Sequence, residues 1–260
     1  MSESASPAMD IRLMNAASAV LFSVFALLLL VSATRWVARL AAFDIQGITV
    51  RGDMAHNNIP SMRANVLPRV RGTFFTTELL PVRQAYESMP WVRQAVVRRD
   101  FPNRLRVELQ EHQAVAYWGA EGDSRLLNSF GEVFDANIDE VEPNTLPRLA
   151  GPAGQGPLVW DMYQTLLITL NRAGMELVHV ELSPRGNWRI GLESGAHLEL
   201  GGGDKAAVLK RTERFLQTLP AVAQRYGRNP ASLEYADLRY EQAYALRLRG
   251  VTTLAAVTPK

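Results

Sequence analysis

The sequence predicts an α+β protein with a single transmembrane helix, a three-stranded sheet with two helices, and then a mostly antiparallel β domain with two helices. Three observations predict this class. A long uncharged segment lies near the N-terminus, segments with helical and strand periodicity follow it, and short apolar runs separated by glycine turns fill the rest of the chain. Hydrophobic residues make up 47% of the 260 positions, which is enough for packed cores in one or two domains.

Composition excludes several kinds of chemistry. The chain has no cysteine, so disulfides, thiolate catalysis and cysteine-based metal sites are excluded. Its 28 Lys and Arg residues nearly balance 26 Asp and Glu residues, so the overall charge does not indicate a polyanionic partner.

The uncharged segment is Leu13–Thr34, whose 22 residues would form a helix about 33 Å long. This length matches the hydrocarbon core of a bilayer, about 30 Å thick, and predicts a membrane span preceded by a short tail at residues 1–12. A cleaved secretory signal is the alternative, because Val31–Ala33 ends in small residues that resemble a cleavage site. The flanking arginines do not establish the orientation of the span.

After the span, the hydrophobic periods predict a strand, two helices and two further strands. For elements in this order, a three-stranded sheet with both helices on one face is the compact arrangement that buries their apolar sides. In the last strand Leu105, Val107 and Leu109 should face the core, together with Val92 and Val96 from the strand before it. The predicted elements are a strand at 43–50, helices at 61–67 and 77–89, and strands at 92–99 and 104–110.

Arginines are concentrated in this first region. Residues 35–118 contain twelve arginines and seven carboxylates, and five of those arginines lie between Trp91 and His112. The aromatic residues are not interleaved for base stacking, so nucleic acid is not an expected partner. The alternation instead predicts a charged solvent face on a half-buried hairpin, able to meet lipid headgroups or the acidic stretch of a protein.

The remaining chain predicts a β domain with two helices and short strands. Gly174 fits the position that ends the first helix, and the second helix has an apolar stripe. The expected elements are two short strands around Gly131, a segment from Leu146 to Pro152 that leads into a loop rich in glycine and proline, a helix at 158–173, strands at 177–182, 188–192 and 197–200, a helix at 205–219, and a long strand at 233–249.

Catalytic and metal-binding patterns are not found. The four histidines His56, His112, His179 and His197 are not spaced as metal ligands, and Gly201–Lys205 lacks the spacing of a phosphate-binding loop. We therefore predict no catalytic residues, no metal site and no cofactor.

Several motifs together resemble the POTRA domain of the FtsQ family of bacterial division proteins, called DivIB in some bacteria. Each motif alone is weak, but they occur in the family's order. They are Phe43-x-Ile45-x-x-Ile48-x-Val50-x-Gly52, Gly72-x-Phe74-Phe75, Pro90-Trp91-Val92, Val97-Arg98-Arg99-x-Phe101-Pro102-Asn103-x-Leu105-x-Val107, Glu111, and Ala114-x-Ala116-x-Trp118.

The resemblance implies one membrane helix, a POTRA domain and a β domain outside the cytoplasmic membrane, with the N-terminus in the cytoplasm. We therefore expect five regions along the chain. They are a cytoplasmic tail at 1–12, the transmembrane helix at 13–34, the POTRA domain at 40–115, the β domain at 116–250, and a flexible tail at 251–260.

The long C-terminal strand is the predicted binding site. Its apolar and polar residues alternate, so it is either an ordinary core strand or an edge strand that accepts another chain by β-augmentation. The resemblance implies the second, with FtsB, paired with FtsL, docking there. The residues concerned are Arg239, Tyr240, Glu241, Gln242, Ala243, Tyr244 and Arg247.

The predicted function is thus a non-enzymatic scaffold of the division septum in the bacterial inner membrane. It would recruit FtsB and FtsL at the C-terminal edge and other division proteins through the POTRA domain, and so control septal peptidoglycan synthesis. Two alternatives are a membrane-anchored periplasmic enzyme acting on peptidoglycan and a POTRA chaperone module of an outer-membrane assembly system.

Overall fold

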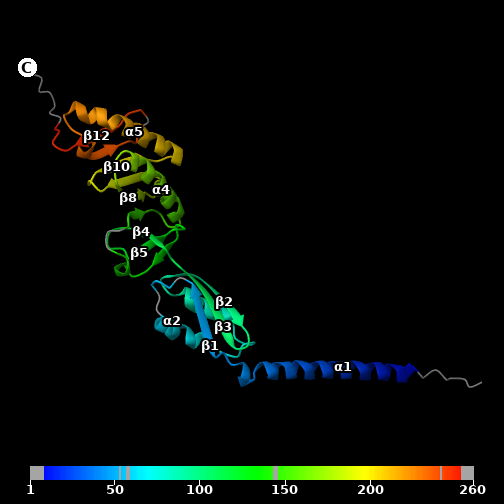
Figure 1. Ribbon diagram of the computed structural model, residues 1–260. Helices are drawn as coiled ribbons and strands as arrows, with labels where there is room; N and C mark the ends of the chain where they lie inside the picture. Colours follow the sequence, from blue (N-terminus) through cyan, green and yellow to red (C-terminus); the bar gives the residue numbers. More distant parts are fainter. Residues whose placement is uncertain (1–8, 53, 57–58, 143–145, 241, 253–260) are drawn as a thin grey trace, which may run out of the picture. The chain divides into compact units, whose positions relative to one another are not determined.

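The computed structural model describes residues 9–52, 54–56, 59–142, 146–240 and 242–252 (Figure 1). The chain divides into two compact units between Glu111 and His112, here called the N-terminal and C-terminal units.

Helix α1 spans Met9–Ala38 and begins earlier than the predicted membrane segment. Residues 9–12, expected in a tail, are helical because proline and glycine are absent from Met9 to Ala38, so nothing interrupts the helix. Within the described part of the chain, this is the one helix long and apolar enough to cross a membrane, over Leu13–Ala38. None of its most apolar part is buried.

Besides α1, the N-terminal unit contains the predicted three-stranded sheet and two α-helices. The strand order is β1-β3-β2, with β1 parallel to β3 and β2 antiparallel to it. The elements are the 3-10 turn Ala41–Phe43, β1 Gly47–Gly52, α2 Ile59–Val66, the 3-10 turn Leu67–Arg69, α3 Leu79–Glu87, β2 Val92–Asp100 and β3 Arg104–Glu111.

Leu105, Val107 and Leu109 of β3 are buried beneath the helices, as predicted. The prediction that Val96 faces the core is wrong. A register shift between Val92 and Gln94 lets Val92 and Ala95 share the buried face, so Val96 lies opposite the exposed Glu108 and is only partly buried. The first strand also starts four residues later than predicted, because the 3-10 turn precedes it.

The C-terminal unit is built on one nine-stranded sheet, of order β12-β11-β10-β9-β8-β7-β4-β5-β6. Five of its eight described strand pairs are antiparallel. The elements are β4 Ala114–Trp118, β5 Arg125–Asn128, β6 Val133–Asp135, the 3-10 turn Ile138–Glu140, β7 Arg148–Ala150, α4 Gly156–Arg172, β8 Leu177–Leu182, β9 Trp188–Leu192, β10 His197–Gly201, α5 Lys205–Arg225, the 3-10 turn Pro230–Ser232, β11 Leu233–Asp237 and β12 Ala245–Leu248.

Helices α4 and α5 contact each other and pack against this sheet (Figure 1). Their apolar stripes form one core with the strands, in which Leu166 of α4 and Phe215 of α5 are fully buried. Asp204 caps α5 by accepting a hydrogen bond from the Ala207 N–H at 2.8 Å, and Gly174 follows α4 with a φ of +69°, as predicted for a helix end.

One strand of this unit was not predicted, and two sequence predictions need correction. The segment expected to lead into a loop contains β7, a short parallel strand between β4 and β8 whose Leu149 is fully buried. Helix α5 continues past Pro220 to Arg225. The long strand predicted at 233–249 is wrong, because the chain forms two antiparallel strands there.

Replacing Leu105 with Ala should destabilise the N-terminal unit by about 2–5 kcal/mol, since it leaves a cavity between the sheet and the helices. The matched control is Leu80→Ala. The Leu80 side chain on α3 is 57% exposed, so its truncation should change the free energy of unfolding little. Denaturant unfolding of the full chain in detergent would measure both. Equal effects of the two variants would contradict the burial described for this sheet.

Candidate partner-binding edge

The C-terminal end of the nine-stranded sheet is a hairpin. Strand β11 pairs in parallel with β10 on one side and antiparallel with β12 on the other. The segment Leu238–Tyr244 links the two strands, and β12 is therefore the last strand of the sheet.

Arg239 and Asp237 hold the chain where it leaves β11. The Arg239 guanidinium donates to both carboxylate oxygens of Asp237, with Nη2 at 2.6 Å from Oδ2 and Nε at 2.9 Å from Oδ1. The backbone N–H of Arg239 donates to the same Oδ1 at 3.1 Å, which is the turn-forming bond that Asp side chains favour. The Arg239 hydrogen bond lowers the pKa of Asp237 below its usual value.

A glycine makes room for this turn. Gly201 ends β10 with a φ of +79°, and a Cβ built there would lie 3.3 Å from the Arg239 Cα and 3.1 Å from its Cγ. A side chain at this position would therefore be strained and would also press on Arg239. The peptide N–H of Leu238 donates to the Glu199 carbonyl at 2.8 Å, so the pairing with β10 continues one residue beyond β11.

Strand β12 has two different faces and one open edge. Leu246 and Leu248 pack against the core, whereas Ala245 and Arg247 are exposed. No described strand pairs with the outer side of β12. Its outward N–H and C=O groups can therefore accept an extended chain.

A groove with a volume of about 750 Å³ lies beside this open edge. One wall comes from Val222 of α5 and from Tyr226, the residue that follows this helix, and the Tyr226 side chain is 58% exposed. The other residues lining it are Tyr244, Leu246, Arg247, Leu248, Val251 and Thr252. An added strand would thus meet apolar surface as well as backbone groups.

The structure places the predicted binding residues in different environments. Tyr240 is 60% exposed in the linker, where Gln242 and Ala243 are exposed as well. Arg239 is held by Asp237, and Glu241 lies outside the described residues.

Tyr244 and Arg247 flank the open edge from different sides. The Tyr244 ring packs edge-on against Phe215 at a centroid distance of 5.1 Å, and its hydroxyl lies 2.7 Å from the Thr218 Oγ1. Tyr244 therefore anchors the linker to α5, whereas Arg247 is free to face a partner from β12.

The sheet face next to the hairpin carries paired charges. Arg189 on β9 lies 2.6 Å from the Glu199 carboxylate and 3.5 Å from Glu181, and the Asp237 pair continues the row. The Glu199 hydrogen bond raises the pKa of Arg189. Because these charges satisfy each other, we expect the groove and the open edge to contribute more to binding than this face does.

Val222 and Tyr226 were not predicted as site residues, because the second helix was expected to end at Leu219. A signal was present in the sequence. Leu219, Ala223 and Tyr226 continue the three- and four-residue spacing of the apolar stripe beyond Pro220.

Within the described ranges, no group of three or more His, Cys, Asp or Glu side chains is placed to hold a metal ion. The edge offers backbone groups, some apolar surface and a few charges, which is chemistry suited to recognising a polypeptide.

Comparisons with known proteins define the class. Residues 43–112 match the model of the FtsQ-type POTRA domain, and residues 116–239 match the model of the C-terminal region of the cell division protein FtsQ/DivIB. The fold and these matches define a bacterial cell division protein with a POTRA domain, a mixed-sheet domain and an N-terminal apolar helix that fits a membrane anchor.

Relatives over the whole chain identify the family. Cell division protein FtsQ of Thiomonas arsenitoxydans is 37% identical over 245 residues, covering 94% of this chain and 89% of the relative. The protein of the same name from Burkholderia pseudomallei is 36% identical over 246 residues, covering 94% and 96%. The chain belongs to the FtsQ family of cell division proteins, and this placement does not favour the outer-membrane chaperone alternative.

Asp237→Asn should loosen the hairpin, because it weakens the pair with Arg239. The pKa of Asp237 is lowered in the folded chain, so its stabilising effect is present above the unfolded value of about 4 and is lost as pH falls through the folded value. We expect the melting temperature at pH 7 to fall by about 2–4 °C, with the difference from wild type shrinking below about pH 4. A difference that is unchanged at low pH would contradict this role.

Gly201→Ala should also disturb the linker, through backbone strain and the contact with Arg239. The expected cost is about 1–3 kcal/mol, measured by denaturant unfolding. Gly195→Ala is the matched control, because Gly195 also has positive φ, at +82°, but has open space around a built Cβ. If the close approach to Arg239 matters, Gly201→Ala lowers the free energy of unfolding more than Gly195→Ala does. Equal losses in the two variants would mean that backbone strain alone accounts for the effect.

Proposed function

We propose that this FtsQ family member is a non-catalytic scaffold of the division septum, which captures FtsB, paired with FtsL, along the open edge of β12. The observation that carries the proposal is the combination of a strand edge that no described strand pairs with and an adjoining groove that is lined in part by apolar side chains. Capture of this pair would link the chain to the septal peptidoglycan synthase.

Backbone pairing supplies the first part of this recognition. An extended segment added to β12 would form main-chain hydrogen bonds along Ala245–Leu248. Side chains on alternate positions of that segment would point toward the groove, where they would meet Leu246, Val222 and Tyr226.

Exposed residues of the linker supply the second part. The Tyr240 side chain is already exposed, so a partner can contact its aromatic ring without any change in the core. Aromatic residues dominate the binding energy of many interfaces. Arg247 adds a charge on the exposed side of the edge strand. The Asp237 and Arg239 pair fixes where the linker starts, and Tyr244 fixes where it ends.

The membrane arrangement follows from the family and the apolar helix. We propose a single-pass protein of the inner membrane, with a cytoplasmic N-terminus and both units on the periplasmic side. The resemblance supports this orientation, which the flanking charges do not establish. Other division proteins would bind the POTRA domain.

Tyr240→Ala should weaken binding of an FtsB segment by roughly tenfold, because it removes an exposed aromatic contact of the interface. The measurement is a titration of the full chain in detergent with the FtsB segment, by calorimetry. Phe130→Ala is the matched control, since the Phe130 side chain is 53% exposed in the turn between β5 and β6, at the opposite edge of the sheet.

Affinity that stays unchanged in Tyr240→Ala, with the melting temperature also unchanged, would contradict the docking proposal. The alternative function, an enzyme acting on peptidoglycan, predicts that the purified chain converts peptidoglycan without added partners. We expect no such conversion.

A further inference from the structure

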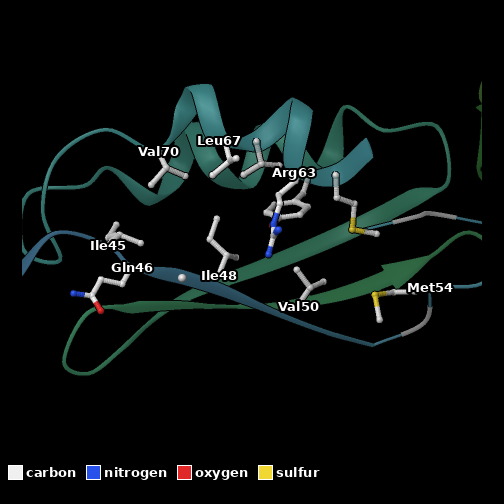
Figure 2. A pocket seen from close by; sticks show the side chains of 12 residues that line it. Ile45, Gln46, Ile48, Val50, Met54, Arg63, Leu67 and Val70 are labelled. Atoms are coloured by element: carbon white, nitrogen blue, oxygen red, sulfur yellow. The ribbon is translucent and has the colours of Figure 1, made fainter. Parts of the chain in front are cut away.

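A second groove lies in the N-terminal unit, between β1 and the segment of α2 and its following turn (Figure 2). Its volume is about 500 Å³. Figure 2 shows Ile48 and Val50 on the strand side and Leu67 and Val70 on the opposite side, with Met54 at one end. Most of the lining is therefore apolar.

The groove opens along a strand edge. Strand β1 pairs with β3 on one side, and no described strand pairs with its other side. Ile48 and Val50 pack against the core but stay only partly buried, on the side of β1 that no other described strand covers. The Leu67 side chain is 55% exposed, which is unusual for a leucine next to a core.

Positive charge surrounds the opening. Arg63 of α2 points across the groove in Figure 2, and Arg51, Arg69 and Arg71 lie in the segments on either side of it. All four side chains are exposed, and the ion pairs formed among described residues do not include them. From residue 45 to residue 72 the sequence has four arginines and one carboxylate, at position 53, which lies outside the described residues.

We propose that this groove docks an extended segment of another protein, in which apolar side chains alternate with carboxylates. The segment would pair with β1, which at about 3.3 Å per residue offers roughly 20 Å of backbone. Its apolar side chains would fill the groove, and its carboxylates would meet the arginines around the opening. This site is separate from the β12 edge and does not depend on the function proposed for that edge.

An anionic membrane could also attract these arginines. A membrane surface would leave the N–H and C=O groups of β1 unpaired, and it would not fill the groove that runs along the strand. The strand edge and the apolar lining together therefore favour a polypeptide, and lipid binding becomes an outcome of the test.

The test measures hydrogen exchange of the full chain in detergent with a synthetic peptide, Thr-Val-Glu-Ile-Glu-Val-Thr. We expect the peptide to slow exchange in residues 47–52 of β1 and to leave residues 92–100 of β2, the other edge of the sheet, unchanged. A peptide of scrambled order and one with Lys in place of Glu should protect neither segment.

Two matched pairs of variants test the contacts. Leu67→Ala should weaken peptide binding roughly tenfold, whereas Leu80→Ala, at a similarly exposed leucine outside the groove, should not. Arg63→Glu should weaken it roughly tenfold at low salt, whereas Arg98→Glu on β2 should not. All four sites are exposed, so folding should be retained.

Three results would overturn the proposal. The first is equal binding of the ordered and scrambled peptides, and the second is a lack of protection in residues 47–52. The third is protection of residues 47–52 by phosphatidylglycerol vesicles that the peptide does not compete away, which would assign the surface to lipid.

Discussion

The ion pair between Asp237 and Arg239 is the contact on which the C-terminal edge depends. It ends β11 after five residues and lets the chain return as β12. Without that reversal, the alternating sequence would continue as one strand, and β11 itself would be the last strand of the sheet. Gly201 is part of the same constraint, since a side chain there would be strained at positive φ and its Cβ would lie only 3.1 Å from the Arg239 Cγ.

The two units share one structural feature, an edge strand beside a groove. Each sheet has an edge strand, β1 or β12, with a helix beside it and a groove between strand and helix that is lined in part by apolar side chains. An edge of this kind would favour aggregation unless a partner covers it or charges protect it. Arginines lie near both edges, including Arg51 and Arg247, so the same residues can limit unwanted pairing and select partners.

Much of the fold could be predicted from the sequence, because hydrophobic period and turn residues act locally. The buried face of β3, the cap at Asp204 and the helix end at Gly174 are of this kind. The errors come from effects that period alone does not reveal. The bulge in β2 places Val96 on the face opposite to the predicted one. At the C-terminus, the hydrogen bond between Asp237 and the Arg239 N–H forms a turn, although the apolar and polar residues go on alternating through the linker.

The sequence indicates where the candidate edge lies but not its shape. The predicted segment lies at the last two strands of the sheet, and its role in binding stays a prediction. The groove wall at Val222 and Tyr226 depends on tertiary contacts that the sequence pattern does not reveal. Tyr244 shows the difference most clearly. The resemblance placed it in the partner-binding set, whereas its ring and hydroxyl contact α5 in the structure.

Hydrogen exchange of the full chain in detergent, with and without an FtsB segment, tests docking at the β12 edge most directly. We predict slower exchange in residues 245–248 of β12 when the segment binds, and no change in residues 133–135 of β6, the other edge of the same sheet. Binding that leaves residues 245–248 unprotected would contradict docking at this edge.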